Sequence, residues 1–193
     1  ISDDGWEAGA EVYRIKKSTK GKNENVTEKL IDGLEGIESK LLKPNLLVNR
    51  YFKEEIATIE NLEIERDGIT TQLEEMEEEH GGEEGLLADV KNDKDKITTA
   101  GVKDRMKKIK GQKDYKDEYD LLHKYLELSE SKSELGKKIS ILESELETKV
   151  WNRYGTLTVE EIKFLVVDDK WMPVLDAAIH SEMQRISQRL TQR

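Results

Sequence analysis

The chain has 193 residues and carries 32 Lys and Arg against 42 Asp and Glu, which gives a formal net charge of −10. The absence of cysteine excludes disulfide scaffolds, thiolate metal sites and a cysteine nucleophile. No apolar run is long enough to cross a membrane and no secretory leader is visible, so we expect a cytoplasmic protein. Because the first residue is Ile1 and not Met, we also expect a fragment of a longer protein.

Residues 1–44 differ in pattern from the rest of the chain. Weak alternation of apolar and polar residues over 6–15 is typical of one strand or an extended arm. The basic, polar stretch 16–25 indicates a linker or exposed loop, and two glycines weaken a helix prediction for 26–42. The sequence therefore predicts an N-terminal arm or linker with, at most, a short extended or β segment.

Two long apolar stripes of helical period follow. Pro44 suits the first turn of a helix. From there to residue 79 a heptad-like stripe runs through Val48, Phe52, Ile59, Leu62, Ile69, Leu73 and Met76, with polar lapses at Glu55 and Arg66. The second stripe lies in residues 116–152, at Leu121, Tyr125, Leu128, Leu135, Ile139, Leu142 and Leu146. Two helices of similar length with one connection favour an antiparallel hairpin. We expect a mainly α fold with a long, coiled-coil-like hairpin over residues 45–152 and with Leu73 and Leu142 in one seam.

The connection, residues 81–116, has helical signals of its own. Glycines from Gly81 onward end the first long helix, 83–90 suits a short helix, and Thr98 or Thr99 caps another that ends at Gly111. Within 91–116 there are ten basic residues against four acidic ones. This charge favours contact with a nucleic-acid backbone through Lys103, Arg105, Lys107, Lys108 and Lys110. The alternative is that these residues pair with the acidic helix beside them.

Residues 153–193 predict two further helices. Thr158 and Glu161 form a capping box before a helix over 159–166, and Asp168 or Asp169 caps the next, with Pro173 in its first turn. The last helix has an apolar stripe from Trp171 to Leu190. We expect its first half to pack near Trp151 and its distal half to bind a partner helix through Met183, Ile186 and Leu190.

No residue set in the sequence predicts catalysis. There is no nucleophile–base pattern, phosphate loop or glycine-rich cofactor loop, and so no small-molecule substrate is expected. His123 and Glu127 are one helical turn apart but lack further metal ligands, and the acidic run 74–79 lacks the spacing of a calcium loop. We therefore interpret both as exposed helix surface.

Three C-terminal stretches are distinctive: WNRYGTLTVEEIK (151–163), LVVDDKW (165–171) and SQRLT (187–191). They resemble the C-terminal region of the modification (M) subunit of type I restriction–modification enzymes, an adenine-N6 DNA methyltransferase that uses S-adenosylmethionine. The resemblance is most specific here. It extends to LLVNRYF (46–52), EEEHGGEEGLL (77–87) and KKIKG (107–111), whereas residues 1–44 match poorly.

The family's catalytic motifs are a glycine-rich cofactor loop and Asn-Pro-Pro-aromatic. Neither is present, since Pro44 and Pro173 are the only prolines and neither follows Asn. The resemblance thus implies a non-catalytic C-terminal fragment, with residues 1–44 leading from the catalytic domain and S-adenosylmethionine bound only by the parent subunit. It implies docking on the specificity subunit and, through it, assembly with the restriction subunit. The alternatives are a DNA-contacting arm and a homodimeric coiled-coil module.

Overall fold

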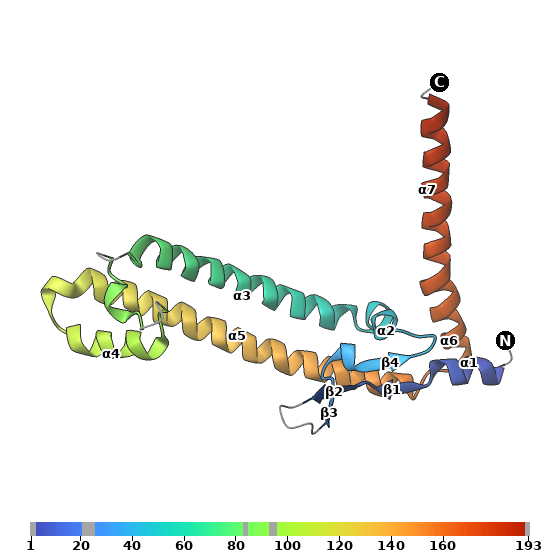
Figure 1. The fold of residues 1–193 in the computed structure, drawn as a ribbon, viewed down its shortest axis with the longest axis horizontal. Helices are drawn as coiled ribbons and strands as arrows, with labels where there is room; N and C mark the ends of the chain where they lie inside the picture. The colour runs from blue at the N-terminus through green and yellow to red at the C-terminus, as the bar shows by residue number, and fades with distance from the viewer. Residues whose placement is uncertain (1–2, 21–25, 83–84, 93–95, 192–193) are drawn as a thin grey trace. The chain divides into compact units, whose positions relative to one another are not determined.

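A computed structural model describes residues 3–20, 26–82, 85–92 and 96–191, and most of them are helical (Figure 1). The chain divides into two compact units. Unit 1 comprises Ile1–Ile56 together with Glu143–Arg193, and unit 2 comprises Ala57–Leu142. The mainly α fold is confirmed, whereas the expected segments 1–44, 45–152 and 153–193 do not coincide with these two units.

The N-terminal residues form a short helix followed by two small sheets. Helix α1 (Asp3–Ala10) precedes β1 (Val12–Arg14), β2 (Lys16–Lys20), β3 (Val26–Leu30) and β4 (Ile37–Ser39). Strand β1 pairs antiparallel with β4, and β2 pairs antiparallel with β3. The prediction of one extended segment over 6–15 is therefore wrong for 6–10, where Trp6 and Ala10 are buried one helical turn apart.

The stretch 16–25 was expected to be a linker, yet its first half is strand β2. Residues 21–25 of that prediction lie outside the described residues. Pairing with β3 comes from backbone hydrogen bonds in register, Lys16 opposite Leu30. Because the sequences KKSTK and VTEKL show no sustained alternation of apolar and polar residues, the sequence pattern could not reveal the pairing.

The β segment is attached to helix α5 (Lys116–Tyr154) through Glu147. The Arg14 guanidinium pairs with the Glu147 carboxylate, whose second oxygen accepts a 2.8 Å hydrogen bond from the Gly33 amide. Gly33 has φ of +83°, a conformation that glycine adopts without steric cost. Arg14 also lies over the Trp151 ring, 4.9 Å from its centroid. These contacts hold Arg14 and the turn at Gly33 against the last turns of α5 within unit 1.

The core of unit 1 combines residues from both ends of the chain. Helix α2 (Pro44–Tyr51) begins at Pro44, as predicted, and its Leu47 is fully buried. The Tyr154 hydroxyl donates a 2.6 Å hydrogen bond to the Leu42 carbonyl in this core. The fully buried side chains of unit 1 are Leu42, Leu47, Val150, Leu165 and Val166.

The expected single helix over 45–79 is interrupted once. Helix α2 ends at Tyr51 and α3 (Lys53–His80) begins two residues later, because Phe52 has non-helical angles of φ −130° and ψ 33°. The α2 residues Leu47 and Val48 are buried, and α3 buries Ile59, Leu73 and Met76. The apolar residues of α2 are therefore buried in unit 1, and those of α3 from Ile59 onward are buried in unit 2.

Unit 2 is an antiparallel pair formed by α3 and α5, with a small cap (Figure 1). Helix α4 (Thr99–Ile109) is capped by Thr98 and followed by Gly111 at φ +83°, as the sequence predicts. The expected helix over 83–90 is only a 3-10 turn, Ala88–Val90, and residues 83–84 are not described. The buried cluster consists of Leu73, Met76, Leu87, Val90, Val102, Ile109, Leu122 and Tyr125.

This cluster corrects the predicted seam in two places. Leu122 is fully buried where Leu121 was expected, because α4 and the 87–90 segment cover that side of α5. Leu142 is half-buried, so only Leu73 of the expected pair belongs to the core.

The C-terminal helices are continuous. Helix α6 (Val159–Phe164) passes through a π-helical segment (η4, Leu165–Trp171) into α7 (Met172–Thr191). The expected cap at Asp168 or Asp169 is therefore wrong. The Met172 amide donates to the Val167 carbonyl, five residues back. A π segment widens the helix, and the following Pro173 has no N–H to lose and needs that room for its ring.

Candidate partner-helix interface on α7

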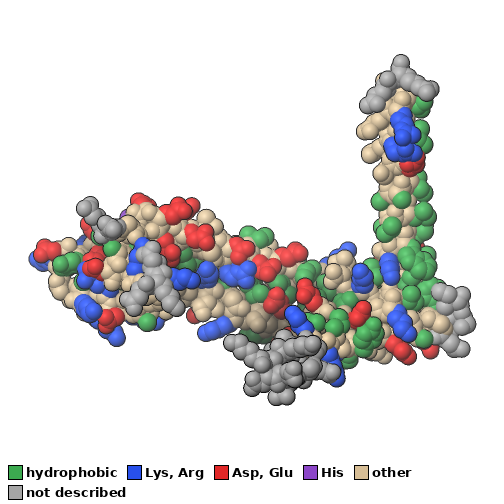
Figure 2. All heavy atoms as spheres, viewed as in Figure 1, with side chains coloured by type: hydrophobic (Ala, Val, Ile, Leu, Met, Phe, Trp, Pro, Cys, Tyr) green, Lys and Arg blue, Asp and Glu red, His purple; other side chains and the backbone are tan. Residues whose placement is uncertain are grey.

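Helix α7 presents an apolar stripe to solvent. Every residue from Trp171 to Thr191 is exposed, and the side chains of the stripe remain 46 to 69% accessible. Figure 2 shows these hydrophobic side chains following the length of α7. We define the α7 face as Trp171, Val174, Leu175, Ile179, Met183, Ile186 and Leu190. Exposed apolar surface of this extent is typical of an interaction site.

The polar side of α7 stabilises the helix from within. His180 lies 3.3 Å from Asp176 one turn before it, and Arg185 donates a 2.7 Å hydrogen bond to Glu182. The Arg185 guanidinium lowers the pKa of the Glu182 carboxyl. Such i,i+3 and i,i+4 pairs support a helix without any neighbour. The α7 face is therefore presented on a helix that has local support of its own.

Three contacts anchor the residues that lead into α7. Arg50 of α2 pairs with Asp169 of the π segment at 3.1 Å, and its guanidinium lies 4.0 Å from the centroid of the Phe164 ring. The Lys170 ammonium donates a 2.7 Å hydrogen bond to the Leu41 carbonyl. The Asp169 and Lys170 contacts tie the π segment to the residues around α2, and the Phe164 contact ties α6 to the same helix.

Trp171 does not pack near Trp151 as expected. Its ring lies 6.4 Å from the ring of Trp6 in α1, at an interplanar angle of 50°. Trp151 instead lies under Arg14. The first half of the stripe was expected to close on the hairpin, but Leu175 and Ile179 are half-exposed like the distal residues.

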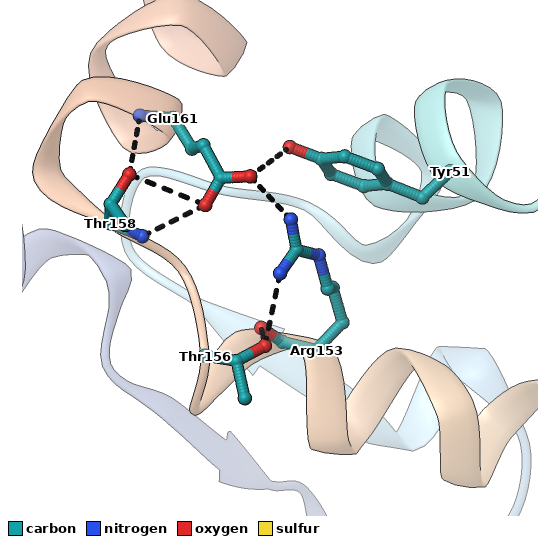
Figure 3. Close-up of polar contacts among 5 residues, drawn as sticks. All are labelled: Tyr51, Arg153, Thr156, Thr158 and Glu161. Atoms are coloured by element: carbon teal, nitrogen blue, oxygen red, sulfur yellow. Dashed lines mark hydrogen bonds and ion pairs between the residues drawn. The ribbon is translucent and has the colours of Figure 1, made fainter.

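Helix α6 is anchored by a polar cluster around Glu161 (Figure 3). The capping box is confirmed: the Thr158 amide donates to Glu161 at 3.0 Å, and the Glu161 amide donates to the Thr158 hydroxyl at 3.3 Å. The same carboxylate pairs with Arg153 and accepts a 3.3 Å hydrogen bond from the Tyr51 hydroxyl. The Thr158 amide and the Arg153 guanidinium lower the pKa of Glu161.

The Glu161 cluster joins three helices. Tyr51 ends α2, Arg153 lies in the last turn of α5 and Glu161 lies in the first turn of α6, and the Arg153 guanidinium stacks 4.4 Å from the centroid of the Tyr51 ring. The sequence alone predicted the Thr158–Glu161 part, because its spacing is local. Tyr51 was missed because no sequence pattern brings residues 110 positions apart together. Arg153 is only eight residues from Glu161, but it lies on another helix across the turn, and its spacing matches no local motif.

The structure places the predicted interface residues on one face. Met183, Ile186 and Leu190 are exposed and follow one another at three and four residues along α7. The face extends further toward the N-terminus than predicted, to Trp171. The added residues carried the same periodic signal, and they were assigned to the chain's own core only because a neighbour was assumed.

The predicted DNA-contacting residues lie in unit 2, and three of the five are ion-paired. Lys103 pairs with Glu130 at 2.8 Å, Lys108 with Asp104 at 2.9 Å, and Arg105 with Glu118 and Asp89 at 2.6 and 2.9 Å. Lys107 and Lys110 are exposed. DNA contact stays a prediction. The carboxylates of these pairs lie on α5, on α4 itself and in the 88–90 turn, so the expected pairing with the acidic helix beside the segment, α3, is not what holds these three residues.

No group of His, Cys, Asp and Glu within the described part of the chain is arranged to hold a metal ion. His123 lies 3.4 Å from Glu127, as a surface pair on α5.

Among the helices described, none combines the length and apolar character that crossing a bilayer would need. Glu74–Glu79 lies on α3, where Glu77 accepts a 2.5 Å hydrogen bond from the Tyr125 hydroxyl.

Comparison with known proteins adds no relative: family models, curated proteins and solved structures were all searched, and none matches the chain.

Proposed function

We propose that this chain is a non-catalytic helical assembly module, the C-terminal region of a type I restriction–modification M subunit, which docks on the specificity subunit through α7. The observation that supports the proposal most is the α7 face, an apolar stripe that is exposed from Trp171 to Leu190. The resemblance at 151–163, 165–171 and 187–191 suggests the partner. Catalysis, S-adenosylmethionine and the link to the restriction subunit belong to the assembled cytoplasmic enzyme in this proposal.

A helical partner fits the spacing of the face. Leu175, Ile179, Met183, Ile186 and Leu190 follow at intervals of four, four, three and four residues. This is the pattern by which an amphipathic helix packs lengthwise against other helices. At about 1.5 Å per residue, the 20 residues of α7 span roughly 30 Å, enough for several turns of contact.

The anchored start of α7 supports a docking role. The Arg50–Asp169 and Lys170–Leu41 contacts fix the π segment, and the Glu161 cluster fixes α6. A helix that is already formed and anchored loses less conformational entropy on binding than a disordered segment would. Because the side chains of the α7 face are 46 to 69% exposed, burying the exposed part of each contributes on the order of 1 kcal/mol.

The test is co-purification with the specificity subunit. We expect Met183→Asp together with Ile186→Asp to abolish it, because two carboxylates would be buried in an apolar contact. Both side chains are exposed, so the melting temperature of the chain alone should hardly change.

A matched control lies on the other side of α7. Gln184→Asp together with Gln188→Asp adds the same charge and lowers helix propensity at least as much, and we expect co-purification to persist. Unfolding of the Met183/Ile186 variant would assign the stripe to the core of unit 1, whereas unchanged co-purification would reject α7 as the docking helix. Light scattering then measures the molar mass of the chain alone. If the original chain is a dimer and the Met183/Ile186 variant is a monomer, the homodimeric alternative is favoured.

A further inference from the structure

The cap of unit 2 contains an open hollow of about 670 Å³ between the end of α4 and the start of α5. Its floor is apolar: Ile109 belongs to the buried cluster, and the half-buried Tyr119 packs against that cluster. The turn at Gly111, with φ of +83°, forms part of the wall. The lining residues are Ile109, Lys110, Gly111, Gln112, Lys113, Lys116 and Tyr119.

Ion pairing divides the basic residues of the cap into two groups. Lys103, Arg105 and Lys108 each have a carboxylate within 2.9 Å. Lys110, Lys113 and Lys116 are exposed, and across the described ranges no ion pair involves them. All three unpaired lysines line the hollow. We name them the lysine rim.

An apolar floor inside a cationic rim selects for one kind of ligand. The floor favours an apolar or aromatic side chain, and the lysine rim favours carboxylates on either side of it. We propose that this hollow binds an acidic peptide segment that inserts an apolar side chain. The binding site is separate from the α7 face, so it adds a second interaction to the proposed function and does not depend on it.

Duplex DNA fits the same surface less well. A phosphate backbone would contact the lysine rim but leave the apolar floor unfilled. It would also extend past the cap toward the rest of unit 2, where Asp and Glu number 15 against 5 Lys and Arg over residues 57–80 and 117–142. The acidic side chains there would repel a long row of phosphates. A short acidic peptide would place its few charges beside the lysine rim alone.

The experiment measures fluorescence anisotropy of a short fluorescein-labelled peptide that has a single Phe between runs of Glu, added to the full chain. We expect binding that weakens as salt is raised. Replacing the Phe by Gly in the peptide should weaken binding about tenfold, because the apolar anchor is lost. Varying the peptide leaves the protein's own core untouched.

Variants of the chain locate the site. Lys110→Glu, Lys113→Glu and Lys116→Glu together should weaken binding by about tenfold or more, since each exposed ion pair contributes a factor of a few. The control reverses Lys124, Lys137 and Lys138, three exposed lysines of α5, which makes the same change in charge within unit 2. The control should bind like the original chain, and circular dichroism should show both variants folded.

Four results would overturn the proposal. These are no binding at millimolar chain, equal binding of the Gly peptide, equal weakening by the control variant, or tighter binding of a labelled single-stranded or duplex DNA that the rim variant abolishes. The last result would assign the hollow to nucleic acid.

Discussion

Helices α5 and α7 carry apolar stripes of the same period, yet only one stripe is buried. Leu122 and Val150 of α5 are fully buried, whereas Leu175 of α7 is 54% exposed. Helical spacing of apolar residues thus shows that a helix has one apolar face. What covers that face is decided by other segments, and for α5 these are α3, α4 and the N-terminal residues.

The charged residues of the two helices differ in the same way. On α5, Glu118 pairs with Arg105 of α4, and Lys149 pairs with Glu55 of α3 at 3.0 Å. On α7, His180 and Arg185 pair with residues of the same helix. Helix α5 is therefore tied to its neighbours along its length, while α7 is tied to unit 1 at its start. This contrast predicts which substitutions destabilise the chain and which affect only binding.

The largest effect is expected at the core of unit 2. Leu122→Ala removes a fully buried side chain and leaves a cavity among Leu73, Val102 and Tyr125. The expected loss is about 2–5 kcal/mol, measured by hydrogen exchange of amides in α4 and the first half of α5. A loss below about 0.5 kcal/mol would show that the α5 stripe is not buried as described.

The next effect concerns the Arg105–Glu118 pair. The Glu118 side chain is 8% exposed, and Arg105→Gln would leave its carboxylate without its charged partner. We expect a loss of about 1.5–3 kcal/mol, seen as faster exchange of the α4 amides. Arg185→Gln breaks the exposed pair on α7 and serves as the control, with amide exchange of unit 2 unchanged. Similar behaviour of both variants would contradict the contrast between α5 and α7.

A smaller effect is expected at Glu161. Glu161→Gln should destabilise α6 by about 1 kcal/mol, because the Arg153 pair becomes a neutral contact. Since the folded structure lowers the pKa of this carboxyl, its contribution is present above the ordinary Glu pKa of about 4.3 and is lost as pH falls through the lowered value. The free energy of unfolding should therefore depend less on pH in the acid range for Glu161→Gln than for the original chain. Glu160→Gln, at the exposed neighbour, should leave that pH dependence unchanged. Identical acid profiles would reject the role of the cluster.

The smallest effect is expected on α7. Leu175 is exposed, so Leu175→Ala opens no cavity in a core, and Ala has a higher helix propensity than Leu. The free energy of unfolding should therefore change by less than about 0.5 kcal/mol. Thermal unfolding followed by circular dichroism measures this. A loss comparable to that of Leu122→Ala would mean that α7 packs within unit 1.

The sequence determined the local structure of this protein. The periods of the apolar residues, Pro44, the Thr158–Glu161 box, the Thr98 cap and the glycine at 111 all act over a few residues, and the structure has helices and ends where they predict. The candidate residues Met183, Ile186 and Leu190 came from the same periodic signal. Local backbone geometry and the gathering of apolar residues on one face are encoded within a turn or two of helix.

Only the tertiary structure decided how these pieces are used. The described N-terminal residues contact α5 through Arg14–Glu147 and Tyr154–Leu42, pairs whose members are more than a hundred residues apart. The break at Phe52, the lysine rim and the exposed α7 face likewise depend on which neighbours fill which side. Burial and ion pairing are properties of chain segments in contact, and a stripe of apolar residues is the same in sequence whether or not another segment covers it.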